Sequence, residues 1–366
     1  MRHAHAWLVL IMAFVPTLAA AQDPVADRVR RILEATPLID GHNDLPGLLW
    51  DRTRGDLGRY DLRGGTDGDT DWPRMRAGRV GGQFWSVYVS VDEARPAVRQ
   101  LEQIDIARRL IAAYPDELEL ALTADDVEAA FGRGRIASLL GMEGGHVIEN
   151  SLGALRSFFD LGARYLTLTH FSNTDWADSA TDTAQHGGLT DFGREVVREM
   201  NRLGMLVDLS HVSAETMHDA LDVAEAPVIF SHSGARALSD SPRNVPDDVL
   251  RRLPGNGGVV MQVFYPGYVA PDGGEVATVA QVADHIDHIA DVAGHDHVGI
   301  GSDFDGIPEY VTGLEDVSTF PVLFAELARR GWSDEELARL AGGNVLRVMR
   351  QAEATARRLG AGSPGR

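Results

Sequence analysis

Histidines and carboxylates follow several short apolar runs of the chain, and side chains of these two types are ligands for divalent metal ions. In the segment Asp40-Gly41-His42-Asn43-Asp44, the side chains of His42 and Asp44 are two residues apart and point the same way on an extended backbone. The other candidates are Glu143, His170, His211, His232 and Asp303. Nitrogen and oxygen ligands without thiolates suit zinc in a hydrolytic site, and manganese, iron, cobalt and nickel are chemically compatible with them.

These candidates outnumber the ligands that one ion needs. A catalytic zinc takes about three protein ligands, and the strand ends of this chain offer at least six. Two ions bridged by a carboxylate would use the surplus, clamp a hydroxide and polarise a substrate carbonyl. A single histidine at a strand end is more often a hydrogen-bonding core residue. The whole set, on regularly spaced strands, predicts a metal site.

Eight apolar runs rich in β-branched residues recur along the chain, most of them followed by an amphipathic stretch. The runs are Leu38–Gly41, Phe84–Ser90, Ile136–Gly141, Arg164–Thr169, Met205–Leu209, Ala226–Ser231, Gly258–Val263 and His297–Gly301. Such near-continuous apolar strands are typical of a parallel sheet buried on both faces. Eight strand-then-helix units predict an α/β fold, a single-domain (β/α)8 TIM-like barrel, whose strand ends meet at one rim.

Helix signals separate the runs. Asp191–Leu203 is closed by Gly204, and Val279–Val292 is followed by Gly294. The Gly-, Asp- and Arg-rich stretch Asp51–Gly82 is predicted to be a long loop near the active-site end. Two C-terminal helices, Ser333–Leu340 and Asn344–Leu359, are predicted to pack against the outside of the barrel.

Both ends of the chain are distinct from this barrel. Residues 1–21 have a basic start, the apolar run Trp7–Val15 and an A-x-A site before Gln22, which is typical of a cleaved secretory signal peptide. Pro16 interrupts the run, which is shorter than the roughly 20 apolar residues of a membrane span. We therefore expect an exported protein, periplasmic or secreted and without a stable membrane anchor, with its barrel domain at residues 22–359. The polar residues 360–366 are predicted to form a flexible tail.

Composition excludes several functions. The 366 residues carry a formal net charge of −20, which repels nucleic acids and anionic membranes. Cysteine is absent, which removes disulfides, thiolate metal sites and cysteine nucleophiles. Lysine is absent too, which removes a carbamylated-lysine metal bridge and Schiff-base catalysis.

One arginine stands near the predicted rim. Arg243 follows the sixth run within Ser241-Pro242-Arg243-Asn244-Val245-Pro246, where two prolines restrict the backbone. A guanidinium held beside a metal site could grip a substrate carboxylate with two hydrogen bonds. By its residue type and position alone, a surface arginine in a loop is the better interpretation.

These motifs together resemble the membrane dipeptidase (renal dipeptidase) family of zinc peptidases, in its bacterial exported form. The similarity extends from about Val25 to about Arg350. The stretches that carry it are Ile39–Pro46, Gly78–Ser86, Glu143–His146, Leu168–His170, Trp176–Ser179, Asp208–His211, Ser231–Arg236, Arg243–Asp248 and Gly299–Gly306. Gly234 and Trp72 depart from residues common in relatives, and neither position is a ligand.

The resemblance implies two zinc ions on a TIM-like barrel. His42 and Asp44 would bind one ion, His211 and His232 the other, and Glu143 would bridge them. His170 would contact the substrate and stabilise the oxyanion. The other two implied roles belong to Arg243, which would hold the C-terminal carboxylate, and Asp303, which would carry protons and meet the free amine. The implied reaction is hydrolysis of free dipeptides by a metal-bridging hydroxide, including dipeptides with a C-terminal D-residue.

Other interpretations stay open at this point. One is a different metal-dependent amidohydrolase on the same barrel, such as an N-acyl amino acid deacylase or a cyclic amide or β-lactam hydrolase. That wider group usually carries H-x-H on its first strand, where this chain has His42 and Asp44. Another is a non-catalytic binding protein, which would be expected to lack some ligands. A homodimer is compatible with the sequence, but it would not be disulfide-linked.

Overall fold

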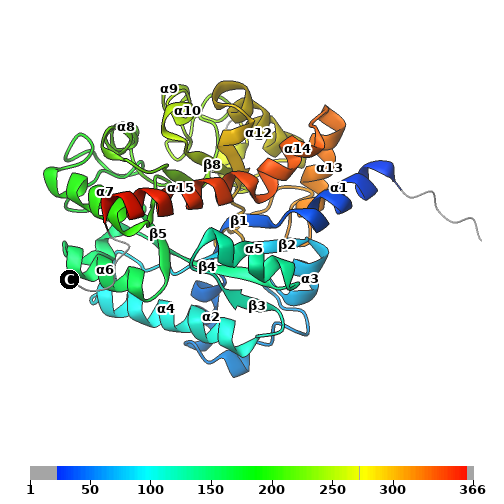
Figure 1. Cartoon of the computed structure of the whole chain (residues 1–366), viewed down its shortest axis with the longest axis horizontal. Helices are drawn as coiled ribbons and strands as arrows, with labels where there is room; N and C mark the ends of the chain where they lie inside the picture. The colour runs from blue at the N-terminus through cyan, green and yellow to red at the C-terminus, as the bar shows by residue number, and fades with distance from the viewer. Residues whose placement is uncertain (1–22, 272, 361–366) are drawn as a thin grey trace, which may run out of the picture.

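A closed barrel of eight parallel strands forms the centre of the protein, as a computed structural model shows for residues 23–271 and 273–360 (Figure 1). The strands are β1 (Leu38–Asn43), β2 (Val80–Ser86), β3 (Leu118–Leu120), β4 (Ile136–Glu143), β5 (Ala163–Thr167), β6 (Leu206–Asp208), β7 (Ile229–Ser233), β8 (Val259–Gln262) and β9 (Val298–Ile300). The ring runs β1, β2, β4 to β9 in order, and β9 pairs with β1. The extra strand β3 pairs with the first residues of β4. The predicted (β/α)8 barrel is confirmed.

Helices cover the outside of this barrel (Figure 1). They are α1 (Pro24–Ala35), α2 (Leu45–Thr53), α3 (Trp72–Ala77), α4 (Pro96–Ala113), α5 (Ala124–Gly132), α6 (Leu152–Asp160), α7 (Asp191–Leu203), α8 (Ala214–Val223), α9 (Asp247–Leu250), α10 (Leu253–Asn256), α11 (Pro266–Val269), α12 (Val279–Ala293), α13 (Phe320–Arg330), α14 (Asp334–Ala338) and α15 (Asn344–Leu359). Local chemistry sets their ends: Thr123 caps α5 in a reciprocal capping box, and Gly204 ends α7 in the left-handed region.

The stretch Asp51–Gly82 is not the single long loop that was predicted. It contains the end of α2, the whole of α3 and the start of β2. Asp71 accepts a hydrogen bond from the Arg74 backbone and caps α3. Gly81 lies within β2, and a Cβ at this position would lie only 2.7 Å from the Pro37 Cα. Close packing beside β1, rather than a turn, explains this glycine.

Strand limits also differ from the sequence prediction. The second predicted strand, β2, ends at Ser86 instead of Ser90, and the sixth, β7, begins at Ile229 instead of Ala226. The short strand β3 was not predicted. Residues 1–22, which include the predicted signal peptide, and residues 361–366 of the predicted tail lie outside the described residues. Within the part of the chain that the structure describes, no helix is both long and apolar enough to cross a membrane.

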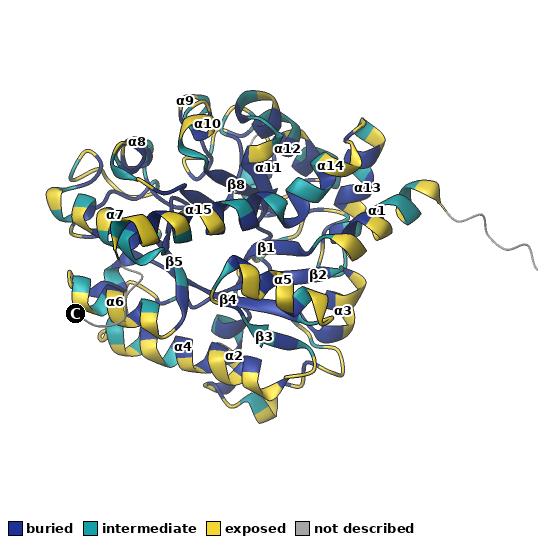
Figure 2. Cartoon of the chain, viewed as in Figure 1, coloured by how far each residue is buried: buried dark blue, intermediate teal, exposed yellow. Residues whose placement is uncertain are grey.

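The barrel is apolar at one end and polar at the other. All residues of β1, β2 and β4 are buried, as are most residues of the other strands (Figure 2). At the apolar end, Phe84, Leu139 and Ile229 pack in one cluster with residues of α15. The carboxyl ends of the strands instead carry His42, Glu143 and the other polar candidates. The apolar end therefore supports a polar rim.

The C-terminal helix α15 packs against the outside of the barrel, as predicted, and the structure adds that it does so at the apolar end, which it closes. Arg347 donates to the Gly257 carbonyl just before β8, and Asn344 donates to the Val298 carbonyl at the start of β9. Val348 and Met349 are buried in the cluster that fills the barrel. A π-helical stretch, Arg339–Gly343, joins α14 to α15. The helix therefore forms the floor of the barrel, opposite the polar rim.

Truncation of this floor is expected to destabilise the fold. Met349→Ala removes a side chain that is 4% exposed, and we expect the free energy of unfolding to fall by about 2–5 kcal/mol. Arg357→Ala changes an exposed residue of the same helix and should shift it by no more than about 0.5 kcal/mol. Urea unfolding of both variants measures the difference. Equal stabilities would contradict the assignment of α15 as part of the core.

Candidate active site

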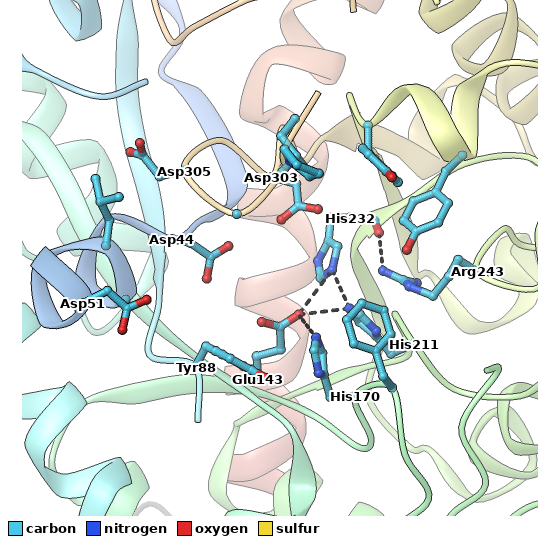
Figure 3. A pocket seen from close by; sticks show the side chains of 18 residues that line it. Asp44, Asp51, Tyr88, Glu143, His170, His211, His232, Arg243, Asp303 and Asp305 are labelled. Carbon is cyan, nitrogen blue, oxygen red and sulfur yellow. Dashed lines mark hydrogen bonds and ion pairs between the residues drawn. The ribbon is translucent and has the colours of Figure 1, made fainter. Parts of the chain in front are cut away.

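One cavity of about 480 Å³ opens at the carboxyl ends of the strands, a volume typical of small-molecule sites. Seven of the eight candidate residues line it, and Figure 3 shows them converging: Asp44, Glu143, His170, His211, His232, Arg243 and Asp303. The eighth, His42, is fully buried and reaches Asp44 and Glu143 through its Nε2 atom. The structure thus brings all eight predicted site residues together.

Glu143 stands at the centre of this arrangement. It is the last residue of β4, and its Oε1 lies 3.0 Å from His211 Nε2 and 3.4 Å from His232 Nε2. Its other oxygen, Oε2, lies 3.4 Å from His42 Nε2. His170 Nε2 is farther away, 3.8 Å from Oε1. One carboxylate therefore faces imidazoles from opposite sides of the barrel.

Two overlapping sets of metal ligands share this carboxylate. His42, Asp44 and Glu143 form one set, and Glu143, His211 and His232 form the other. The Nε2 atoms of His211 and His232 are 2.9 Å apart, and His42 Nε2 is 3.2 Å from Asp44 Oδ2. Two ligands of a tetrahedral ion at 2.0–2.1 Å lie about 3.3 Å apart, close to these separations. His42 Nε2 is buried and accepts no hydrogen bond from the described residues. The donor set therefore fits divalent metal ions.

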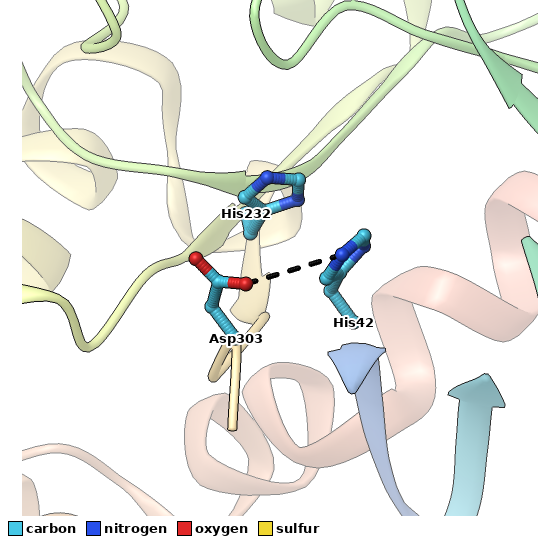
Figure 4. Close-up of side chains that lie close together, drawn as sticks. All are labelled: His42, His232 and Asp303. Atoms are coloured by element: carbon cyan, nitrogen blue, oxygen red, sulfur yellow. Dashed lines mark ion pairs between the residues drawn. The ribbon is translucent and has the colours of Figure 1, made fainter. Parts of the chain in front are cut away.

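A third set joins His42, His232 and Asp303 (Figure 4). Asp303 Oδ1 lies 3.9 Å from His42 Nε2, and the Asp303 backbone N–H donates to the His42 carbonyl, 3.1 Å away. This contact joins the chain after β9 to the end of β1. Asp303 therefore stands beside both ligand sets instead of within either.

Hydrogen bonds orient two of the histidines. Tyr165, from the middle of β5, places its hydroxyl 2.8 Å from His42 Nδ1 and donates to the Gly41 carbonyl. The Ser231 hydroxyl lies 2.8 Å from His232 Nδ1 and donates to Asp208. In both cases the network places a proton on Nδ1, which directs Nε2 toward Glu143.

Burial and charge set the protonation of the site. The pKa values of His211 and His232 are lowered well below the usual value, because burial disfavours the charged ring and neighbouring cations add to the effect. Both rings are therefore neutral, the form that binds metal. Although burial raises the pKa of Glu143, the positive charge of His42 and hydrogen bonds from His211 and His232 hold it well below its usual range. Glu143 is ionised.

The pKa of Asp303 is shifted in the opposite direction. Burial raises it well above the usual value, and the negative charges of Asp44 and Glu143 add to this effect. The Asp303 carboxyl group therefore retains a proton at a pH where Glu143 has lost its own. A carboxyl group poised in this way can exchange a proton with a bound molecule.

Backbone conformation is unusual at two of these residues. His211 and Asp303 both have φ = 69°, in the left-handed region that non-glycine residues rarely adopt. Strained backbone of this kind tends to cluster at functional sites. Here it occurs just after β6 and β9, and the side chains of His211 and Asp303 both line the cavity.

Arg243 is buried, whereas its position in the sequence favoured an exposed arginine in a loop. It is 1% exposed, and its Nη2 donates to the His232 carbonyl at 3.3 Å. Its Nε and Nη1 atoms are buried and have no hydrogen-bond partner among the described residues. Its guanidinium lies 5.2 Å from the centre of the Tyr268 ring. A buried cation with free donors that lines the cavity is suited to an anionic ligand.

His170 lies at the edge of the cavity between aromatic neighbours. Its ring centre is 4.7 Å from that of Tyr88 and 4.1 Å from that of Phe171. Burial lowers the pKa of His170, so the ring is neutral and can donate one hydrogen bond. It is held close to the ligand sets without belonging to either.

Several residues of the site were given no role by the sequence analysis. Tyr165, Asp208 and Ser231 act behind the ligands, and Tyr268 packs beside Arg243. A tyrosine inside a strand expected to be buried was the one available signal, since its buried hydroxyl must find a partner. His285, on α12, has a structural role instead: it accepts a hydrogen bond from the Ala235 N–H and donates one to the Val269 carbonyl.

Fold and site together define a metal-dependent hydrolase built on a (β/α)8 barrel. The model for the membrane dipeptidase family (peptidase family M19) matches residues 26–363, and the chain belongs to that family. The resemblance inferred from the sequence motifs is thereby confirmed. The chain is a metallopeptidase that acts on dipeptides.

Solved structures agree with this assignment. The dipeptidase AC, a metallopeptidase of the same family, is 30% identical with a TM-score of 0.79, over 87% of this chain and 98% of that one. A metallopeptidase from Rhodobacter sphaeroides, solved with a phosphinate mimic of the dipeptide L-Ala-D-Ala, is 29% identical with a TM-score of 0.79, over 87% and 99%. The probable dipeptidase PvdM from Pseudomonas aeruginosa shares the fold at 24% identity, with a TM-score of 0.82 over 91% and 99%.

Removal of the Tyr165 hydroxyl is expected to weaken metal binding. In Tyr165→Phe, the Nδ1 proton of His42 loses its acceptor, and zinc affinity should fall about 10- to 100-fold. Competition between the metal-free protein and a chromogenic chelator measures this affinity. Tyr114→Phe is the matched control, because the Tyr114 hydroxyl bonds to the Leu62 backbone away from the site. Equal affinities in the two variants would refute the role of Tyr165.

Proposed function

We propose that this protein is a two-zinc dipeptidase that hydrolyses free dipeptides, including those with a C-terminal D-residue. The observation that carries the proposal is the position of Arg243. It is a buried cation whose Nε and Nη1 have no partner among the described residues, and it lies beside two ligand sets that share the Glu143 carboxylate. Support for a D-residue comes from the Rhodobacter sphaeroides relative, which was solved with a mimic of L-Ala-D-Ala. The secretory features of residues 1–21 add the proposal that the enzyme is exported, to the periplasm or beyond.

Two zinc ions would be held by His42, Asp44 and Glu143 and by Glu143, His211 and His232. When bound, they would supply Lewis acidity for the scissile carbonyl and a water activated for attack at neutral pH. The chain contributes an ionised Glu143 and neutral His211 and His232 rings, so that these ligands are in their binding form. The chemistry of nitrogen and oxygen donors favours zinc, although manganese, cobalt, iron or nickel could occupy the same ligands.

The remaining residues bind and orient the substrate. Arg243 binds the C-terminal carboxylate through its free Nε and Nη1 donors, which fixes the direction of the dipeptide. Asp303 lies on the other side of the ligand sets, binds the free amine and transfers a proton to the leaving nitrogen. His170 donates a hydrogen bond to the oxygen that gains charge in the transition state. A longer peptide would present an amide to Arg243 and leave its charge unpaired.

Metal binding by the proposed ligands can be measured directly. Zinc titration of the metal-free protein, followed by calorimetry or by metal analysis after dialysis, is expected to give two ions per chain. Glu143→Gln should lower the affinity at both positions, because this residue belongs to both ligand sets. His288→Gln is the control, since His288 pairs with Asp247 away from the site. Wild-type stoichiometry and affinity in Glu143→Gln would exclude the shared bridge.

Hydrolysis of a substrate panel tests the activity. Zinc-loaded protein should cleave L-Ala-L-Ala and L-Ala-D-Ala, but neither their N-acetyl derivatives nor the tripeptides. Arg243→Ala should lower kcat/KM by at least about a hundredfold, because it removes a buried charged hydrogen-bond partner, and Arg243→Lys should retain part of the activity. Arg236→Ala, at an arginine that pairs with Asp240, serves as the control.

The panel also separates the alternatives. Cleavage of N-acetyl amino acids or cyclic amides, with free dipeptides left intact, would favour another amidohydrolase on this barrel. Absence of any hydrolysis by the metal-loaded protein would favour a binding protein.

A further inference from the structure

A second cavity lies beside the catalytic one and shares three lining residues with it. It has a volume of about 360 Å³, and we call it the side chamber. Gly47, Asp51 and Tyr88 line both cavities, and we call the boundary that they form the passage. The remaining lining residues are Trp50, Val89, Ser90, Asp92, Glu93, Arg99 and Gln103, from α2, α4 and the segment between β2 and α4.

The side chamber has an excess of negative charge. Among the described residues, neither Asp51 nor Asp92 forms an ion pair at 4 Å or less, and both residues are exposed. The single cation of its lining, Arg99, is already neutralised: it pairs with Glu93 at 3.1 Å and with Glu102, and it stacks on the Trp50 ring. The free charges are therefore carboxylates, which attract a cationic group.

A buried acceptor in the chamber points to a ligand independently of these charges. Gln103, on α4, is 3% exposed and lines the chamber. Its Oε1 atom has no hydrogen-bond partner among the described residues. A buried carbonyl oxygen without a donor is unfavourable unless a bound group supplies one. A guanidinium or ammonium group carries several donors and would satisfy it.

The chamber lies on the opposite side of the catalytic centre from Arg243. Figure 3 shows Arg243 to one side of Glu143, and Asp44 and Asp51 to the other. If Arg243 binds the carboxylate end of a dipeptide, the amino-terminal residue lies toward Asp44, Gly47 and Asp51. Its side chain then faces the passage into the side chamber.

We propose that the side chamber binds a long cationic side chain, that of arginine or lysine, at the amino-terminal position of the dipeptide. This inference rests on the proposed function and narrows its substrate class. Gly47 keeps the passage open, because it has no side chain and a Cβ built there meets no atom within 4 Å. An acidic side chain at the same position is disfavoured by Asp51 and Asp92.

Kinetics with the zinc-loaded protein on L-Arg-L-Ala, L-Ala-L-Ala and L-Glu-L-Ala tests the proposal. The wild-type protein should give a kcat/KM for L-Arg-L-Ala about tenfold above that for L-Ala-L-Ala, the size expected for a partly exposed charge interaction together with a charged hydrogen bond. L-Glu-L-Ala should be the poorest substrate. The ratio of the first two values, measured within each preparation, does not depend on the fraction of active protein.

Variants of the chamber should change this ratio selectively. Asp92→Asn and Gln103→Leu should lower it, and neither residue lines the catalytic cavity. Asp116→Asn is the matched control for charge, because Asp116 lies beyond the other end of α4, a helix about 27 Å long at 1.5 Å per residue. Gly47→Trp should lower the ratio by filling the passage, whereas Gly47→Ala should preserve it.

The outcomes separate this inference from the function on which it rests. If no free dipeptide is cleaved, the proposed function fails and the inference fails with it. If dipeptides are cleaved but the ratio is close to one, or is unchanged in Asp92→Asn, Gln103→Leu and Gly47→Trp, only the side-chamber proposal is overturned. A ratio that falls in these three variants and persists in both controls supports it.

Discussion

The position of one buried carboxylate governs the rest of the site. Glu143 ends β4 with its charge below the protein surface, and such a charge is strongly unfavourable without cations or hydrogen-bond donors. His42, His211 and His232 approach it from β1, the end of β6 and β7. Only a closed barrel brings these strand ends together around one point. The arrangement of imidazoles around a shared carboxylate becomes favourable when divalent cations lie between them.

The two ends of the barrel have different physical roles. At the floor, α15 packs apolar side chains against the strands and stabilises them. At the rim, His211 and Asp303 adopt left-handed backbone conformations that are unfavourable in isolation. Tyr165 belongs to both parts, since its ring packs with Phe84 in the barrel interior and its hydroxyl orients His42. A rigid apolar floor thus supports a strained and polar active site.

The sequence predicted what depends on local pattern and chain order. Strand periodicity predicted the barrel, and the carboxyl ends of its strands carry all the ligand candidates. The loop predicted for Asp51–Gly82 wrongly included Gly81, because whether a glycine serves a turn or close packing depends on a neighbour distant in sequence, here Pro37. For the same reason, the sequence did not predict the hydrogen bond between Tyr165 and His42 or the position of α15 at the floor of the barrel. Each depends on contacts between residues far apart in the chain.

Arg243 shows why the site had to be seen in three dimensions. In the sequence it is one of many arginines, in a loop where exposure is the ordinary expectation. In the structure it is buried, faces the cavity and retains two free donors. The opposite side of the cavity, around Asp44 and Asp51, is acidic (Figure 3). A molecule with a carboxylate at one end and an ammonium group at the other, as a free dipeptide has, matches both sides in only one direction.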